Sequence, residues 1–193
     1  MSVKTYSKKQ HGNDKLSANF SVREFACKDG SDKILIDTDL VLILQKIREH
    51  FGKAVVINSA YRNEAYNKKV GSSSTSQHIK GTAADIRISG VAPEDVAKYA
   101  EYLMPNKGGI GLYPAFTHVD VRASRSRWKN NGKEISVSGF PGYIPPAKKL
   151  ESINDIVWEL HQRGIITDKD LWIKKLTADK DVYWLAYKIC NIK

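Results

Sequence analysis

The chain has few cysteines and no long apolar run, and these two features limit the classes of protein to which it can belong. Its two cysteines, Cys27 and Cys190, lie far apart in the 193-residue sequence and lack the close spacing of a zinc-binding pair. We expect free thiols, and a disulfide between the two is the alternative. No stretch approaches the length of a membrane span, and the polar start of the chain is not followed by an apolar run of signal-peptide length. We therefore expect a protein without a membrane span that is made in the cytoplasm.

Acidic residues are the minority among the charged ones. The 31 lysines and arginines outnumber the 21 aspartates and glutamates, which gives a formal net charge of +10. This excess predicts an anionic partner, and both nucleic acid and the anionic polymers of a bacterial wall would fit. The sequence has no zinc-finger spacing, RNA-recognition motif or basic helix with interleaved aromatic residues, which makes nucleic acid the less favoured partner. A basic nucleic-acid-binding protein remains one alternative function.

The most informative stretch reads SQHIKGTAADIR and covers residues 76–87. It places His78 seven residues before Asp85, with Gly81 between them to allow a sharp turn of the backbone. A second stretch, THVDVR, contains His118. Histidine and carboxylate side chains are zinc ligands, and three protein ligands leave a fourth position open for water. The pattern therefore predicts one Zn²⁺ ion held by His78, Asp85 and His118.

The alternation of side chains along two expected strands supports the same site. If residues 82–88 are extended, Asp85 points to the face opposite its aliphatic neighbours. In residues 117–122, His118 and Asp120 share one face in the same way. Two adjacent strands would then bury the aliphatic residues and turn Asp85 and His118 toward a common pocket.

These motifs resemble those of the zinc peptidases of the D-Ala-D-Ala carboxypeptidase family, which are related to D-Ala-D-Ala dipeptidases, several phage endopeptidases and the hedgehog signalling domain. The resemblance covers roughly residues 16–123 and includes the segment SAYRN at residues 59–63, which is similar to the family's Ser-x-Tyr-Arg segment. It implies an α+β fold in which a small antiparallel sheet with flanking helices holds the zinc site. It also implies hydrolysis of peptidoglycan stem peptides at a bond next to a D-amino acid, by an endolysin or a D,D-carboxypeptidase. Without a secretion signal, an endolysin of the phage type would reach the wall only after release from the cell.

The resemblance also implies roles for residues around the zinc ion. Arg62 would hold the developing oxyanion or a substrate carboxylate, because a planar guanidinium group suits both. Ser76, Gln77 and Tyr113 are expected to bind the substrate. Some relatives carry a Cys-x-x-Cys-like cluster near Cys27, but this chain has no second cysteine there, so we expect no second zinc ion.

One departure from the family pattern concerns the general base. Many relatives place a glutamate three residues before the last histidine, where this chain has Ala115. Asp120 and Tyr113 are the nearest replacements, and Asp120 could alternatively accept a ring N–H from a ligand histidine. We favour Asp120 as the base. Because the missing glutamate also permits a loss of catalysis, a non-catalytic, zinc-bearing module that binds the cell wall is a further alternative.

Composition divides the chain into four parts. We expect a mobile arm over residues 1–15, the zinc peptidase domain over 16–138, a Gly/Pro-rich linker over 139–147 and a helical C-terminal module over 148–193.

Within the domain, periodicity and capping residues predict helices over 39–51, 64–69 and 94–103 and strands over 54–58, 82–88, 108–113 and 117–122. The glycines of the strand over 108–113 would permit close approach of another group. In the C-terminal module, helical spacing predicts three helices that contain three of the four tryptophans. Aromatic residues at this spacing are typical of a core, and binding of the wall by this module is the alternative.

Overall fold

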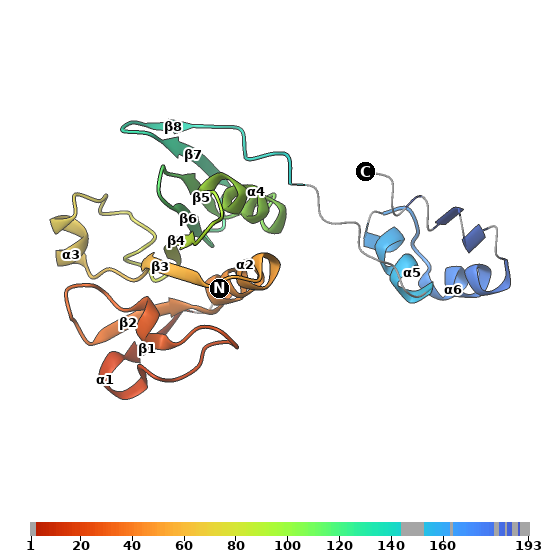
Figure 1. The fold of residues 1–193 in the computed structure, drawn as a ribbon. Coiled ribbons are helices and arrows are strands. Elements are labelled where there is room, and N and C mark those ends of the chain that lie inside the picture. The colour runs from red at the N-terminus through yellow and green to blue at the C-terminus, as the bar shows by residue number, and fades with distance from the viewer. Residues whose placement is uncertain are drawn as a thin grey trace. The chain divides into compact units, whose positions relative to one another are not determined.

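The computed structural model describes residues 3–143, 153–162 and 164–179, together with residues 182, 183, 185, 186 and 189. The chain forms two compact units, Met1–Tyr143 and Ile144–Lys193 (Figure 1). The division between them falls inside the stretch 139–147 that we expected to be a linker.

The first unit is built on a six-stranded sheet with the strand order β3-β4-β6-β5-β7-β8. All neighbours are antiparallel except β5 and β7, which are parallel. The strands are β3 (Val55–Ser59), β4 (Ala83–Ile88), β5 (Gly109–Leu112), β6 (Thr117–Asp120), β7 (Ser126–Asn130) and β8 (Glu134–Ser136). The expected α+β class is confirmed, and a small antiparallel sheet is present as a separate two-stranded pair. The sheet that carries the candidate ligands is larger and mixed rather than small and antiparallel, because two further strands extend it beyond β5 and the first of them is parallel.

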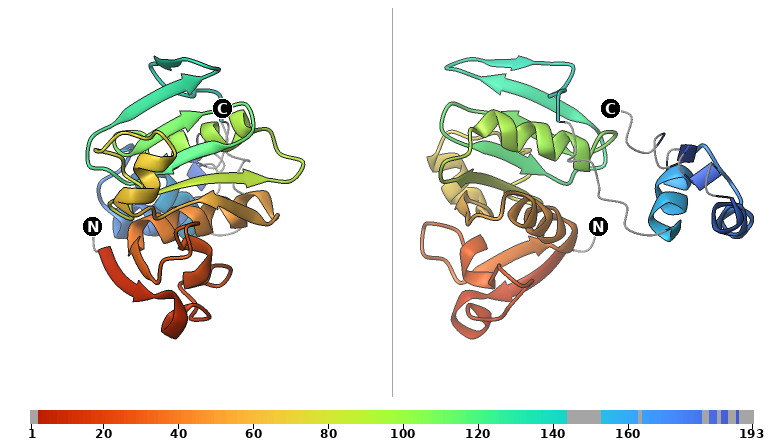
Figure 2. Two further views of the ribbon diagram at one scale, coloured as in Figure 1. Left: turned by 90° about the vertical axis from the view of Figure 1, so that its left-hand side faces the viewer. Right: turned by 45° about the vertical axis from the view of Figure 1, so that its right-hand side comes forward.

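The helices α2 (Thr38–Phe51) and α4 (Pro93–Leu103) contact each other and pack against the sheet (Figures 1 and 2). Their apolar side chains share one core cluster with the aliphatic residues of the central strands, including Ile86, Ile110 and Val119. Because side chains alternate along a strand, Asp85 and His118 are left on the opposite face of the sheet. A third helix, α3 (Glu64–Lys69), begins at Asn63, whose side chain accepts a hydrogen bond from the backbone N–H of Tyr66 at 2.8 Å. These three helices lie where the sequence predicted them.

Residues 3–11 form a strand and a helix, where we expected a mobile arm over residues 1–15. β1 (Val3–Ser7) pairs antiparallel with β2 (Lys33–Asp37), and α1 (Lys8–His11) follows β1 directly. The 3₁₀-helix η1 (Val22–Phe25) contributes Val22 and Phe25 to the core. The arm was predicted from its polar composition, but a strand can be held by backbone hydrogen bonds even where its side chains are exposed.

The second unit contains α5 (Ile153–Gln162) and α6 (Lys169–Ala178). Apolar side chains from both helices and from the residues that follow them form its own small core: Ile156, Val157, Leu160, Ile166, Leu176 and Ala186. The third predicted helix lies largely outside the described residues, as does Cys190. Cys27, in the first unit, is a buried free thiol. In the part of the chain that the structure describes, every helix is too short or too polar to cross a membrane.

Candidate metal centre

The structure brings His78, Asp85 and His118 together. One donor atom from each of these buried side chains lies within 4.8 Å of the other two. His118 Nδ1 lies 2.9 Å from Asp85 Oδ1, and His78 Nε2 lies 3.3 Å from both of these atoms. Two imidazole nitrogens and a carboxylate oxygen that face a common point form a donor set typical of zinc sites with an open fourth position.

Local structure explains how each ligand reaches this point. The pairing of β4 with β6 places Asp85 directly opposite His118. His78 lies in the loop before β4, and this loop turns at Gly81, whose φ is 71°. A Cβ atom on Gly81 would overlap the backbone of Leu35 in β2. In addition, the backbone N–H of Asp37 donates to the carbonyl oxygen of Gly81 at 2.9 Å, so β2 supports the loop that carries His78.

Each ligand is also held from behind by a second group. His78 Nδ1 donates to the carbonyl oxygen of Ala60 at 2.6 Å, which leaves Nε2 for the cluster. His118 Nε2 donates to Asp120 Oδ2 at 3.0 Å, which leaves Nδ1 for the cluster. The second oxygen of Asp85 accepts a hydrogen bond from Arg62 Nη2 at 2.7 Å. Such partners fix the orientation of metal ligands and commonly tune their affinity.

Asp120, which we expected to act as the base, lies on the far side of the His118 ring from the cluster. Its side chain is fully buried. Its Oδ1 accepts hydrogen bonds from the backbone N–H groups of Gly109 and Arg122, each at 3.0 Å, and the Arg122 guanidinium group also contacts the carboxylate. The carboxylate therefore contacts a candidate ligand and has no direct access to the cluster.

The charges of the site balance one another. Burial raises the pKa of the Asp85 carboxyl, but hydrogen bonds from His118 and His78 outweigh it and hold the pKa well below its usual range. Burial lowers the pKa of His118, yet hydrogen bonds to Asp120 and Asp85 reverse the effect and raise the pKa to about 9. The pKa of His78 is lowered, chiefly by burial. The cluster thus favours a positive charge beside Asp85, which a proton or a metal ion can supply.

A polar hollow of about 580 Å³ opens over these three ligands. The residues that the sequence assigned to the substrate line it together: Arg62, Ser76, Gln77 and Tyr113. Arg62 also donates through Nε to Ser59 Oγ at 2.8 Å, so its guanidinium group bridges β3 and the ligand Asp85. The lining also includes the aromatic side chains of Phe116 and Trp128.

Trp128 is the main residue of the site that sequence analysis missed. Successive strand pairings align one row of residues across the sheet, in the order Ser59, Asp85, His118, Gly111, Trp128 and Ser136. The Trp128 ring covers Gly111, where a Cβ atom would overlap it, and its centroid lies 5.1 Å from that of the His118 ring. Its indole N–H donates to the Tyr113 hydroxyl at 3.2 Å. Gly111 was the available signal, since a glycine within a strand marks close approach by another group.

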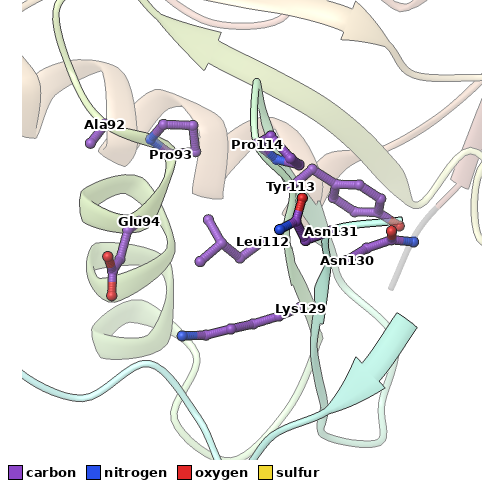
Figure 3. Close-up of a pocket in the computed structure, with 9 residues that line it drawn as sticks. All are labelled: Ala92, Pro93, Glu94, Leu112, Tyr113, Pro114, Lys129, Asn130 and Asn131. Carbon is purple, nitrogen blue, oxygen red and sulfur yellow. The ribbon is translucent and has the colours of Figure 1, made fainter. Parts of the chain in front are cut away.

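A second hollow of about 360 Å³ adjoins the first and shares Tyr113 and Asn130 with it. Figure 3 shows its lining, in which Leu112 and Lys129 extend toward the helix that carries Glu94. Its remaining lining residues are Ala92, Pro93, Pro114 and Asn131.

Comparison with known proteins supports this site. The family model described as Peptidase M15 matches residues 17–120, which is more than half of the chain and includes all three candidate ligands. The peptidoglycan L,D-endopeptidase MepK of Escherichia coli (strain K12) is 36% identical over 80 residues, which cover 38% of this chain and 43% of that protein. The probable peptidoglycan L,D-endopeptidase MepK of Haemophilus influenzae is 46% identical over 61 residues, which cover 31% of each chain. The chain thus spans less than half the length of these curated relatives.

Proposed function

Since the chain belongs to the peptidase M15 family, we propose that it is a zinc-dependent peptidase that hydrolyses stem peptides of peptidoglycan. The observation that carries this proposal is the convergence of His78, Asp85 and His118 at the base of a polar hollow, within the residues that match the family. The names of the relatives support peptidoglycan as the substrate and an endopeptidase rather than a carboxypeptidase reaction. We place the cleaved bond next to a D-amino acid.

The donor set fits zinc. His78 Nε2, His118 Nδ1 and an oxygen of Asp85 would hold the ion, and the hydrogen bonds behind each ligand already set which atom faces it. When bound, zinc would supply Lewis-acid polarisation of the scissile carbonyl group and lower the pKa of water.

The chain's own residues would bind and orient the substrate beside the ion. The Arg62 guanidinium group lines the hollow while it holds Asp85, so it lies where a substrate carbonyl or carboxylate oxygen would approach. Burial raises the pKa of Tyr113 above its ordinary value, so the phenol keeps its proton at neutral pH and is able to donate a hydrogen bond to the substrate. We propose that Asp120 orients His118 and that it is not the general base, because both its oxygens are engaged behind the ring.

We further propose that the protein acts at the cell wall after release, as an enzyme of the endolysin type would. The basic excess of the chain would favour anionic wall polymers. The helical second unit, which has a core of its own, would then provide a separate contact with the wall.

Hydrolysis of purified peptidoglycan and of soluble stem peptides tests the proposal, with zinc content measured on the same samples. We expect about one zinc ion per chain, loss of hydrolysis with a chelator and recovery when zinc is restored. His78→Ala and His118→Ala should lose both zinc and activity. His11→Ala is the matched control, because His11 lies in α1 and outside the cluster. Wall binding without hydrolysis by the zinc-loaded protein would instead favour the non-catalytic module, and stoichiometric zinc in both ligand variants would reject the ligand assignment.

A further inference from the structure

The outer end of the hollow carries a carboxylate that no step above uses. The pairing of β7 with β8 sets Glu134 opposite Asn130, and the parallel pairing of β5 with β7 aligns Leu112 with Lys129. Tyr113 and Asn130, the next residues along, are therefore neighbours. Tyr113, Asn130 and Glu134 all line the hollow, two residues further along the sheet than the row of His118 and Trp128.

Distance excludes Glu134 as a replacement for the general-base glutamate that many relatives have at the position of Ala115. β8 is the third strand from β6 in the sheet. With neighbouring strands about 4.8 Å apart, the backbone of Glu134 lies about 14 Å or more from that of His118. A glutamate side chain cannot bridge this gap, so Glu134 would meet the substrate well away from the cleaved bond.

The charged groups of the hollow near the candidate ligands are paired with one another. The guanidinium groups of Arg62 and Arg122 line the hollow there, and each contacts a carboxylate, that of Asp85 and that of Asp120 respectively. Among the described residues that line the hollow, Glu134 is the one carboxylate besides the candidate ligand Asp85. Burial raises the pKa of Tyr113, and the carboxylates of Glu134 and Asp85 add to the rise, which agrees with a phenol placed between the two.

We infer that Glu134, with the amide of Asn130 beside it, binds a free ammonium group of the peptide substrate. The ligand class is a peptide with an unblocked primary amine, at its N-terminus or on an aliphatic side chain, separated from the cleaved bond by the span from β6 to β8. That span corresponds to about four extended residues, or to fewer residues and a long side chain. The inference rests on the proposed peptidase function and names a feature that the substrate must have.

Two soluble peptides that differ only in whether this amine is free or acetylated test the inference. We expect the zinc-loaded protein to cleave the peptide with the free amine with a kcat/KM about fivefold higher than that for the acetylated peptide. The difference should arise mainly from KM and be modest, because a partly exposed ion pair contributes little binding energy. Glu134→Gln should abolish this preference, and Glu134→Asp should restore part of it. Glu94→Gln is the control, because Glu94 lines only the neighbouring hollow and should leave the preference intact.

Calorimetric titration of the metal-free protein with the same two peptides gives a readout that does not depend on catalysis. Tighter binding of the peptide with the free amine by the native chain, lost in Glu134→Gln, would support the inference even if neither peptide is cleaved. The absence of cleavage would count against the proposed peptidase function alone. An equal preference in the native chain and Glu134→Gln would overturn the inference, as would no preference in the native chain, and both would leave the peptidase function standing.

Discussion

Asp120 and His118 form a buried pair in which the carboxylate accepts the Nε2–H of the imidazole at 3.0 Å. The opposite nitrogen of the same ring faces Asp85 at 2.9 Å. Asp120 thereby decides which nitrogen is offered to a metal ion. A fully buried carboxylate therefore sets the orientation of a side chain that lines the hollow.

Replacing Asp120 should lower the affinity for zinc and should have little effect on kcat once the site is filled. We expect Asp120→Asn to weaken zinc binding about 10- to 100-fold, because the ring loses its charged partner. Competition with a chelator measures this affinity. Once enough zinc is added to fill the site, kcat should recover to near the native value. If activity stays lost at full zinc occupancy, Asp120 acts as the base after all.

The titration of His118 should be visible in the metal-free protein. Its pKa rises from 6.5 to about 9 on folding, so the protonated ring stabilises the fold fully below pH 6.5, and this stabilisation is lost as pH rises through 9. Zinc must displace the same proton, so its apparent affinity should increase by about tenfold per pH unit over this interval. Urea unfolding and chelator competition at several pH values measure the two trends. His118→Ala should show neither, and an equal pH dependence in that variant would assign the effect to another group.

Arg62 should matter for its planar fork as well as for its charge. Arg62→Lys keeps the charge but cannot contact Ser59 and Asp85 together, and we expect turnover to fall about 100-fold with a much smaller loss of stability. Steady-state kinetics on a soluble stem peptide provides the measurement. Arg87→Lys is the matched control, because Arg87 is exposed on the same strand as Asp85. Rates within about twofold of the native value would exclude a catalytic role for Arg62.

Gly111 should not tolerate a side chain. A Cβ atom there would overlap the Trp128 ring, so we expect Gly111→Ala to destabilise the fold by about 1–3 kcal/mol and to lower activity by moving the indole away from His118. Urea unfolding and kinetics report the two effects. Adding Trp128→Phe should recover part of the lost stability, because the smaller ring makes room for the methyl group. Strictly additive losses would show that the two positions do not interact.

The first unit should function without the second, because each has its own core. Deleting residues 144–193 should leave hydrolysis of soluble stem peptides close to the native rate and should weaken lysis of intact walls. Both substrates can be assayed on the same preparation, with circular dichroism as a check of folding. An unfolded or insoluble truncated protein would show that the first unit depends on the second.

The three candidate ligands could be grouped from the sequence because their signals are local. Alternation along single strands assigns Asp85 and His118 to one face, and Gly81 marks the turn that delivers His78. The other findings depend on which strands become neighbours. Trp128 reaches His118 only through the parallel pairing of β5 with β7, which nothing within either strand specifies.

The N-terminal strand and the position of Asp120 illustrate the same limit. Val3–Ser7 reads as a polar arm because its pairing with β2 uses backbone groups. Alternation correctly gives Asp120 the same face as His118, yet it cannot tell which side of the imidazole ring the carboxylate occupies. That depends on the N–H groups of Gly109 and Arg122, which hold the carboxylate behind the ring.

The row that runs from Ser59 through Asp85, His118 and Gly111 to Trp128 would make metal uptake depend on the correct strand register. If β4 slipped by one residue against β6, most backbone bonds could reform, but every side chain of β4 would exchange faces. Asp85 would then enter the apolar core, and the two histidines would lose their shared carboxylate. A chain with the wrong strand register would therefore lose the candidate metal site as well as the native fold. Zinc retention would thus measure the fraction of any preparation, native or engineered, whose strands have paired correctly.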